Sequence, residues 1–189
     1  MCVKVLKLMV GTDSMKLAIC GKMASGKTTL ANYVCDTMGA EKFSLATGVK
    51  NFGNYLFDIP TGHKDRTAYQ KVGEGGRQFL YPNIWIDILI KDIEQSSIET
   101  VVVDDVRYEN EVIHLKEQGW KLIKLTITDE LQLERLKNTY PNDWQTHAQS
   151  RNHASELEVD LIDDSIFDLI IDASDDSQVF QEIKRYLTD

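Results

Sequence analysis

Short apolar runs alternate with amphipathic stretches along this chain, and the alternation predicts strands interleaved with helices. A buried strand needs a few consecutive apolar or β-branched residues, whereas a helix repeats its apolar positions every three or four residues. The strand pattern occurs at 15–20, 41–45, 100–103, 120–128 and 167–171. The helix pattern occurs at 28–35, 47–57, 64–80, 83–93, 109–118, 177–187 and the stretch after Asp129. This order predicts an α/β domain, a three-layer doubly wound fold with a parallel sheet of about five strands.

Several predicted helices also carry start signals. Thr47 and Asp129 are residue types that cap helix N-termini, and Pro82 with Asn83 precedes an apolar helix pattern. Residues 138–151 are polar and aromatic and show no periodicity. A segment of this kind between two periodic segments predicts a mobile loop or a small lid.

Length and charge narrow the class of protein. The chain has 189 residues, which suits one domain with a real core. Its 30 acidic and 21 basic residues give a net charge of -9, so the overall field repels nucleic acid, and we expect no nucleic-acid partner. No apolar run reaches the length of a membrane span or of a secretory signal, so we expect a cytoplasmic protein without a membrane partner. Residues 1–14, before Met15, are expected to be a peripheral extension or the product of an upstream start.

Residues 21–28 match the phosphate-binding pattern G-x-x-x-x-G-K-[ST] at every fixed position, between a predicted strand and a predicted helix. Such a loop points backbone N–H groups at phosphate oxygens, and the start of the helix adds positive charge. Lys27 is then expected along the β and γ phosphates, and the Thr28 hydroxyl on Mg²⁺. The alternative is a chance glycine turn. The predicted triphosphate-binding residues are Gly21, Met23, Ala24, Ser25, Gly26, Lys27, Thr28 and Thr29.

A second phosphate site is predicted in the segment 66–77. Arg66, Gln70, Gly73 and Arg77 follow one another at spacings of four, three and four, which places them on one helix face. Two guanidinium groups can clamp a phosphate while the amide hydrogen-bonds a base edge. The alternative is a solvated helix with surface ion pairs. The glycines inside this segment weaken a helix, and we interpret them as marking a close approach by a ligand or by backbone.

Acidic and basic residues follow the predicted strand 100–103. Asp104 and Asp105 lie at its carboxyl end, where one aspartate suits a direct or indirect magnesium role. Arg107 is close enough in sequence to reach the transferred phosphoryl group. An ordinary polar strand end is the alternative interpretation.

Arginines also lie in or beside the predicted lid. Arg135 and Arg151, with Lys137 and His153, occupy this region. Phosphoryl transfer needs positioning and charge neutralisation, so arginines that a closing lid brings in would stabilise the transition state and exclude water. Loose surface arginines are the alternative.

Together, four segments resemble the deoxynucleoside monophosphate kinases of bacteriophages. They are the loop 21–28, Tyr69–Arg77, the run Asp105–Glu111 and the residues His153–Glu156. The likeness extends over nearly the whole chain from Met15. It implies a P-loop nucleoside monophosphate kinase fold with a parallel core, a helical substrate region and a lid. The implied parts are a core at about 15–46, 83–137 and 156–189, a monophosphate-binding region at about 47–82, and a lid at about 138–155.

The resemblance also implies roles for individual residues. The loop and Lys27 would hold ATP, and Thr28 with Asp105 would serve Mg²⁺. The implied catalytic residues are Lys27, Arg107, Arg135 and Arg151. The implied residues on the side of a deoxynucleoside monophosphate substrate are Lys50, Arg66, Gln70, Arg77, Asp104, Asp105, Arg107 and Glu111. Dimers are common among such kinases, so the resemblance also suggests a homodimer.

The expected reaction is transfer of the γ-phosphoryl group of ATP to a deoxynucleoside 5′-monophosphate. The acceptor phosphate is already ionised near neutral pH, so no general base is needed. Two alternatives remain open. One is a related kinase of a small metabolite such as phosphomevalonate, and the other is a P-loop switch in which nucleotide hydrolysis changes partner binding.

Overall fold

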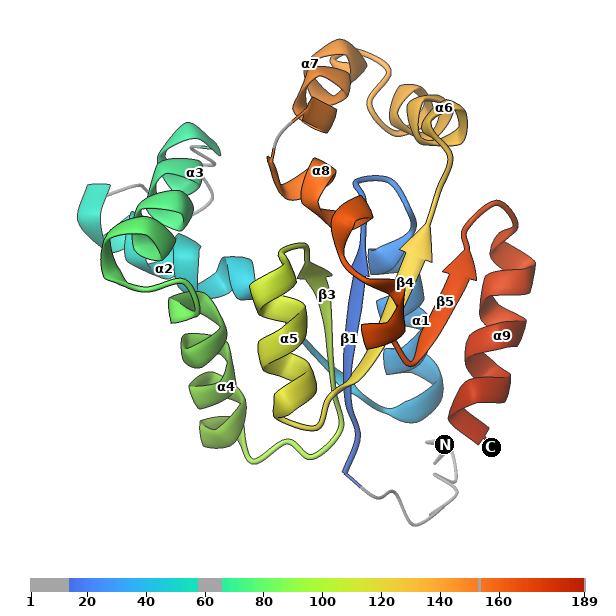
Figure 1. The fold of residues 1–189 in the computed structure, drawn as a ribbon, viewed down its shortest axis with the longest axis horizontal. Coiled ribbons are helices and arrows are strands. Elements are labelled where there is room, and N and C mark those ends of the chain that lie inside the picture. Colours follow the sequence, from blue (N-terminus) through green and yellow to red (C-terminus); the bar gives the residue numbers. More distant parts are fainter. Residues whose placement is uncertain (1–13, 58–65, 153, 189) are drawn as a thin grey trace, which may run out of the picture.

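The computed structural model describes residues 14–57, 66–152 and 154–188. Within them, five parallel strands form one sheet in the order β2-β3-β1-β4-β5 (Figure 1). Since β1 is central and the chain winds from it towards both edges, the doubly wound α/β fold is confirmed. The strands are β1 (Lys16–Gly21), β2 (Glu41–Phe43), β3 (Val101–Val106), β4 (Lys121–Thr126) and β5 (Leu169–Asp172).

Helices cover both faces of the sheet. One face packs on α1 (Lys27–Met38) and α9 (Asp176–Thr188), and the other on α4 (Ile84–Ser96), α5 (Glu109–Glu117) and α8 (Ala154–Leu161). Strand β3 serves both layers because side chains alternate along a strand. Val101 and Val103 join the α4 and α5 core, whereas Val102 joins the α1 and α9 core. This double burial explains the continuous β-branched run.

Two helical groups extend from this three-layer core. The first contains α2 (Leu45–Phe57), α3 (Arg66–Gly75) and the π-helix η1 (Gly76–Leu80), beside α4 on the left of Figure 1. The second, at the top, contains α6 (Asp129–Thr139), α7 (Trp144–Gln149) and the short 3-10 helix η2 (Ser150–Asn152). Another 3-10 turn, η3 (Asp164–Ile166), precedes β5. The start of the predicted helix 64–80 and the break at 60–62 lie outside the described residues.

Most of the segment 138–151 is helical, so the prediction of a loop there is wrong, whereas the alternative of a small lid stays a prediction. Helix α7 has only six residues, too few for an apolar period to emerge from the sequence. Its anchor is the buried imidazole of His147, which stacks on the Tyr140 ring with 3.8 Å between ring centroids. This segment is therefore ordered by one aromatic pair and not by an apolar stripe.

The two predicted helix caps are also wrong. Thr47 lies inside α2, which begins at Leu45 because the distant Asp105 carboxylate accepts the first N–H groups of that helix. Asp129 is the first residue of helix α6 and not its cap. The cap is Thr128, whose hydroxyl accepts the Leu131 N–H. Asp129 instead adds negative charge to the first turn.

The glycines of the predicted substrate helix accommodate side chains of the protein itself. A Cβ atom at Gly76 would lie 2.5 Å from the Trp85 ring, and one at Gly73 would lie 3.4 Å from the Arg77 guanidinium. The Trp85 indole N–H also donates to the Gly73 carbonyl oxygen at 2.9 Å. The interpretation of these glycines as a wall for ligand or backbone is corrected at Gly76, where an indole makes the close approach.

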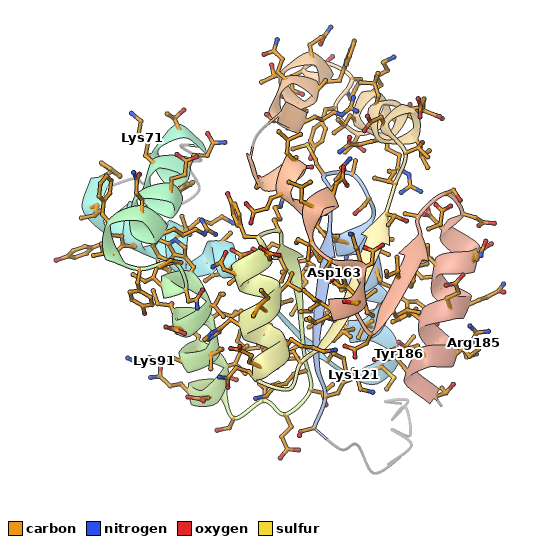
Figure 2. All side chains as sticks on the ribbon, in the orientation of Figure 1. Lys71, Lys91, Lys121, Asp163, Arg185 and Tyr186 are labelled. Atoms are coloured by element: carbon orange, nitrogen blue, oxygen red, sulfur yellow. The ribbon has the colours of Figure 1, made fainter. Side chains whose placement is uncertain are left out.

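Side chains fill the layers on both sides of the sheet (Figure 2). At the lower end of α9, the Lys121 ammonium lies 5.2 Å from the centroid of the Tyr186 ring, and both side chains are labelled there. This contact helps to fasten the last helix against the start of β4. Within the described ranges, no helix combines the length and apolar character needed to cross a bilayer.

Candidate functional site

The loop between β1 and α1 depends on glycines at two positions. At Gly21, φ is +155°, and a Cβ atom would lie 2.7 Å from the Leu125 carbonyl oxygen. At Gly26, φ is +97°, a left-handed conformation that side chains disfavour. Between them, the buried Ser25 hydroxyl has no hydrogen-bond partner among the described residues. The tight turn and the uncommitted hydroxyl both fit a loop that folds around a phosphate group.

Lys27 lies buried at the start of α1 and bends back onto its own loop. Its ammonium donates to the carbonyl oxygens of Gly21 and Lys22, at 2.6 Å each. Burial, and secondarily the neighbouring Arg107 guanidinium, lower the pKa of Lys27 to about 8. Thr28 and Thr29 are exposed on the first turn of the helix. The loop thus holds a lysine whose charged form gains from any added anion.

A carboxylate from α8 reaches the phosphate loop. Glu156 is 2% exposed, and its Oε2 accepts the backbone N–H of Met23 at 2.6 Å. Its Oε1 pairs with Nη1 of Arg107. Sequence reasoning assigned Glu156 no role, although the residue belongs to the quoted segment His153–Glu156. The resemblance of that segment was the sequence signal that could have identified Glu156. His153, in the same segment, lies outside the described residues.

The two aspartates at the end of β3 point to different places. Asp105 accepts hydrogen bonds from the Ser44 hydroxyl at 2.6 Å and from the N–H groups of Leu45 and Ala46 at 3.0 and 2.9 Å. Asp104 is buried, 3.7 Å from the Lys42 ammonium, and its charge acts on Lys27. The magnesium role assigned to Asp105 stays a prediction, but this arrangement favours Asp104, because Asp105 is engaged in capping α2.

Arg77 connects the helical group of α2, α3 and η1 with α5. Its Nη2 donates to the Glu111 carboxylate at 2.7 Å, and its guanidinium lies 4.5 Å from the centroid of the Tyr108 ring. The other oxygen of Glu111 accepts the backbone N–H groups of Arg107 and Tyr108, at 2.9 and 3.2 Å. Glu111 is 2% exposed, and this burial raises its pKa. One buried carboxylate therefore fixes both arginine-bearing segments.

A series of contacts links the first helical group, at Arg77 of η1, to the phosphate loop. They pass from Arg77 through Glu111 to Arg107, and then through Glu156 to the N–H of Met23. The Nε of Arg77 is buried without a hydrogen-bond partner among the described residues, so one guanidinium donor is uncommitted. Arg77 and the Arg107 segment are thus coupled through Glu111, and the charge of Arg107 acts on Lys27 in the loop.

Among the described side chains, those of two other predicted substrate residues, Gln70 and Lys50, lie outside this network. Gln70 is exposed on α3, and Lys50 is exposed on α2. Arg66 is the first residue of α3, but its side chain lies outside the described part of the chain. Arg77, which lies in η1 and not in α3, is the predicted substrate residue of this segment that contacts Glu111, and the roles of the other three residues stay predictions.

The two lid arginines have different positions. Arg135 donates from Nη1 to the carbonyl oxygen of Ala24 in the loop at 3.4 Å and from Nη2 to that of Ala173 at 2.6 Å. Arg151 pairs with Asp129 at 2.9 Å, and this pairing lowers the pKa of Asp129. Arg135 thus touches the phosphate loop directly, whereas Arg151 touches a carboxylate beside it.

Helix α6 contributes one further loop contact that sequence reasoning missed. The buried side chain of Gln132 donates from Nε2 to the carbonyl oxygen of Met23 at 2.9 Å. A single glutamine on a charged helix gave no sequence signal. Among the described residues, no group of three or more His, Cys, Asp or Glu could hold a metal ion. A magnesium ion bound by Thr28, one aspartate and phosphate oxygens needs no such group.

Comparison with known proteins gives one distant sequence relative. No family model matches the chain. The chain is 30% identical over 107 residues to the uncharacterized protein ORF76 of Ictalurid herpesvirus 1 (strain Auburn). The match covers 54% of this chain and 44% of that protein, so the chain spans less than half of the relative's length.

Solved structures resemble the chain over most of its length. Shikimate kinase from Acinetobacter baumannii in complex with shikimate has a TM-score of 0.59 and 15% identity, over 93% of this chain and 94% of that one. Shikimate kinase from Aquifex aeolicus gives 0.57 and 17%, over 92% and 96%. A gluconokinase from Sinorhizobium meliloti gives 0.53 and 13%, over 86% and 85%. At these identities the likeness concerns the fold, and the chain has the P-loop, nucleoside monophosphate kinase-like fold.

Proposed function

We propose that this protein is a kinase that transfers the γ-phosphoryl group of ATP to the 5′-phosphate of a deoxynucleoside monophosphate. The observation that carries the proposal is the series of contacts from the loop N–H of Met23 to Arg77. A loop that only binds a triphosphate has no need of a second, partly buried arginine coupled to the first. A transfer between two phosphate groups does need a second arginine, because both phosphate groups carry charge that must be neutralised at close range.

The donor half of the proposed site is the loop with Lys27 and Arg107. Lys27 is a buried cation at the loop, and Arg107 already binds an acidic oxygen there. Both groups would neutralise the negative charge of the transferred phosphoryl group. Mg²⁺, when bound, would supply further charge neutralisation, and Thr28 with Asp104 or Asp105 would hold it. Arg135, through its contact with Ala24, would steady the outer side of the loop.

The acceptor half of the proposed site is the region 47–82, with Arg77 as its anion-binding residue. Glu111 and Tyr108 hold the Arg77 guanidinium in place, and the side chain is 23% exposed, which leaves part of it accessible to the acceptor phosphate. The acceptor oxygen is already anionic near neutral pH, so the residues named here orient it and need not remove a proton. We propose that α7 and its neighbours at 138–155 form the lid over the two halves.

A coupled assay of ADP formation tests this function. The protein is supplied with ATP and Mg²⁺, and each ribo- and deoxynucleoside monophosphate is added in turn, with Lys27→Ala as the inactive control. We expect at least one deoxynucleotide to accelerate ADP formation by the natural chain and none to do so with the variant. The proposal is wrong if no nucleotide accelerates turnover.

Additional acceptors in the same assay separate the alternatives. Shikimate, gluconate and phosphomevalonate represent kinases of small metabolites. Acceleration by one of these compounds alone would assign the fold to a metabolite kinase. ADP formation at a constant rate, whatever the acceptor, would instead indicate a nucleotide-hydrolysing switch.

A further inference from the structure

The carboxylate of Glu156 lies on backbone donors that the loop sequence assigns to phosphate. It accepts the Met23 N–H at 2.6 Å and pairs with Arg107, and the side chain is 2% exposed. Met23 and Glu156 are 133 residues apart in the chain, so the contact is tertiary and not a feature of the local turn. Burying a carboxylate away from water costs free energy unless charged groups or N–H donors bind it. Glu156 has one of each, the Arg107 guanidinium and the Met23 N–H.

The helix that carries Glu156 is fastened to the same loop by a second contact. The ammonium of Lys22, the residue before Met23, lies 2.5 Å from the Asp160 carboxylate, one turn further along α8. Val159, between these two acidic residues, is 1% exposed and packs in the core. Consecutive loop residues therefore bind two acidic side chains on one face of α8. The placement of Glu156 follows from the docking of a whole helix.

A phosphate oxygen and the Glu156 carboxylate need the same donors. Both are anionic acceptors that bind strongly to an arginine and to a loop N–H. They cannot share these donors without bringing two negative charges together near Lys27, in a setting largely removed from water. Lys27 donates to the carbonyl oxygens of its own loop and, among the described residues, binds no carboxylate there. The acidic group bound to Arg107 is Glu156.

We infer that Glu156 is the resident anion of the phosphate loop: it positions Arg107 at the loop and is displaced by the phosphate of an incoming nucleotide. The Arg107 guanidinium then passes from carboxylate to phosphate without leaving the site, and α8 shifts away from Met23. The free energy of phosphate binding is less favourable by the amount needed to release Glu156, so the loop binds phosphate more weakly. This inference rests on the phosphate-binding part of the proposed function and is independent of the acceptor.

Pyrophosphate binding without magnesium tests the exchange. The full chain is titrated with pyrophosphate in the presence of a chelator, as the natural protein and as Glu156→Gln and Glu158→Gln. Glu158 is the matched control, because it lies on the same helix and its carboxylate accepts the Glu109 N–H of α5 at 3.0 Å. We expect Glu156→Gln to bind pyrophosphate about tenfold more tightly, because the competing charge is gone. Glu158→Gln should bind as the natural chain does.

Two results of the titration would overturn the inference. If Glu156→Gln binds pyrophosphate with unchanged or lower affinity, the carboxylate does not compete with phosphate. If both variants gain the same affinity, the effect is one of overall charge and not of position. Circular dichroism of each variant is the control that tests whether the fold is retained.

Hydrogen exchange of the natural protein gives a test that no substitution can disturb. On addition of saturating pyrophosphate, amides of the loop 21–28 should exchange more slowly and those of α8 more rapidly. Unchanged or slower exchange in α8 would contradict displacement of Glu156. These measurements need no acceptor. If they succeed while no monophosphate stimulates turnover, the kinase proposal fails and this inference stands.

Discussion

The two halves of the proposed site differ in how the chain builds them. The donor loop is made from eight consecutive residues, and its shape depends on Gly21 and Gly26. The acceptor side depends on long-range contacts, such as Arg77 with Glu111, which are 34 residues apart, and Leu45 with Asp105, which are 60 apart. The donor half is thus specified mainly by backbone conformation and the acceptor half by tertiary packing. Damage to the donor half should therefore affect chemistry, and damage to the acceptor half should affect stability as well.

The largest expected effect is on the donor half. Lys27→Met should lower kcat by about 10³-fold in the kinase assay, because the variant lacks the buried ammonium group that would neutralise the charge of the transferred phosphate. The melting temperature of the free protein should not fall, because burial already lowers the pKa of Lys27 to about 8 and keeping its charge is costly. Thermal unfolding and coupled kinetics measure the two effects. A large loss of stability would show that Lys27 is a structural residue and would remove the contrast with the acceptor half.

The matching change on the acceptor side is Arg77→Met. We expect roughly a 100-fold increase in KM for the monophosphate at nearly constant affinity for ATP. Stability should also fall, by about 3 kcal/mol, because Glu111 keeps a buried charge without its guanidinium. Adding Glu111→Gln should recover much of that stability but not the KM. Unchanged acceptor kinetics in the single variant would show that Arg77 does not bind the acceptor.

The same pair of variants has a pH signature. Burial raises the pKa of Glu111 in the folded protein above its ordinary value of 4.5, so the folded state binds this proton more readily than the unfolded state. The stabilisation from this group is complete below pH 4.5 and is lost as pH rises through the folded pKa. Removing Arg77 should move that loss to higher pH. Urea unfolding across the acidic range measures the shift, and a pH dependence unchanged by Arg77→Met would contradict the account of Glu111.

Adjacent glycines test packing in the acceptor half. Gly76→Ala should destabilise the protein by roughly 2 kcal/mol, because the new Cβ atom would lie 2.5 Å from the Trp85 ring. Gly75→Ala should be neutral or stabilising by up to about 1 kcal/mol, since Gly75 has helical angles and its nearest neighbour would be 3.9 Å away. Urea titration measures both. Equal effects would mean that helix propensity, and not the Trp85 contact, decides these positions.

The smallest expected effect is a graded pH dependence of anion binding by the loop. The free protein loses the Lys27 proton as pH rises through about 8. A bound phosphate favours the charged lysine, so binding takes up a proton above that pH, and affinity should fall by up to about tenfold per pH unit. Calorimetric titration with pyrophosphate measures this dependence. Lys27→Met should lack it, and a flat profile in the natural chain would contradict the lowered pKa.

The same contrast explains what the sequence could predict. The alternation of strands and helices and the glycine loop are local patterns, and both the fold and the phosphate-loop turn follow from them. The capping of α2 by Asp105 could not be predicted, because a carboxylate 60 residues away replaces the expected Thr47. Glu156 was visible only as part of a resembling segment, because its partners are a backbone N–H and an arginine on other elements. Side chains whose partners are distant in sequence leave no periodic trace.

The Asp105 cap also has a consequence for the order in which the chain can fold. During synthesis, Leu45 and Ala46 emerge about sixty residues before the carboxylate that accepts their N–H groups. Until then the 13-residue helix α2 begins with unsatisfied donors, and isolated helices of this length are marginal in water. The addition of β3 to the sheet supplies the missing acceptor. We therefore expect the proposed acceptor half to become stable only after β3, the strand that carries Asp104 and Asp105, is in place.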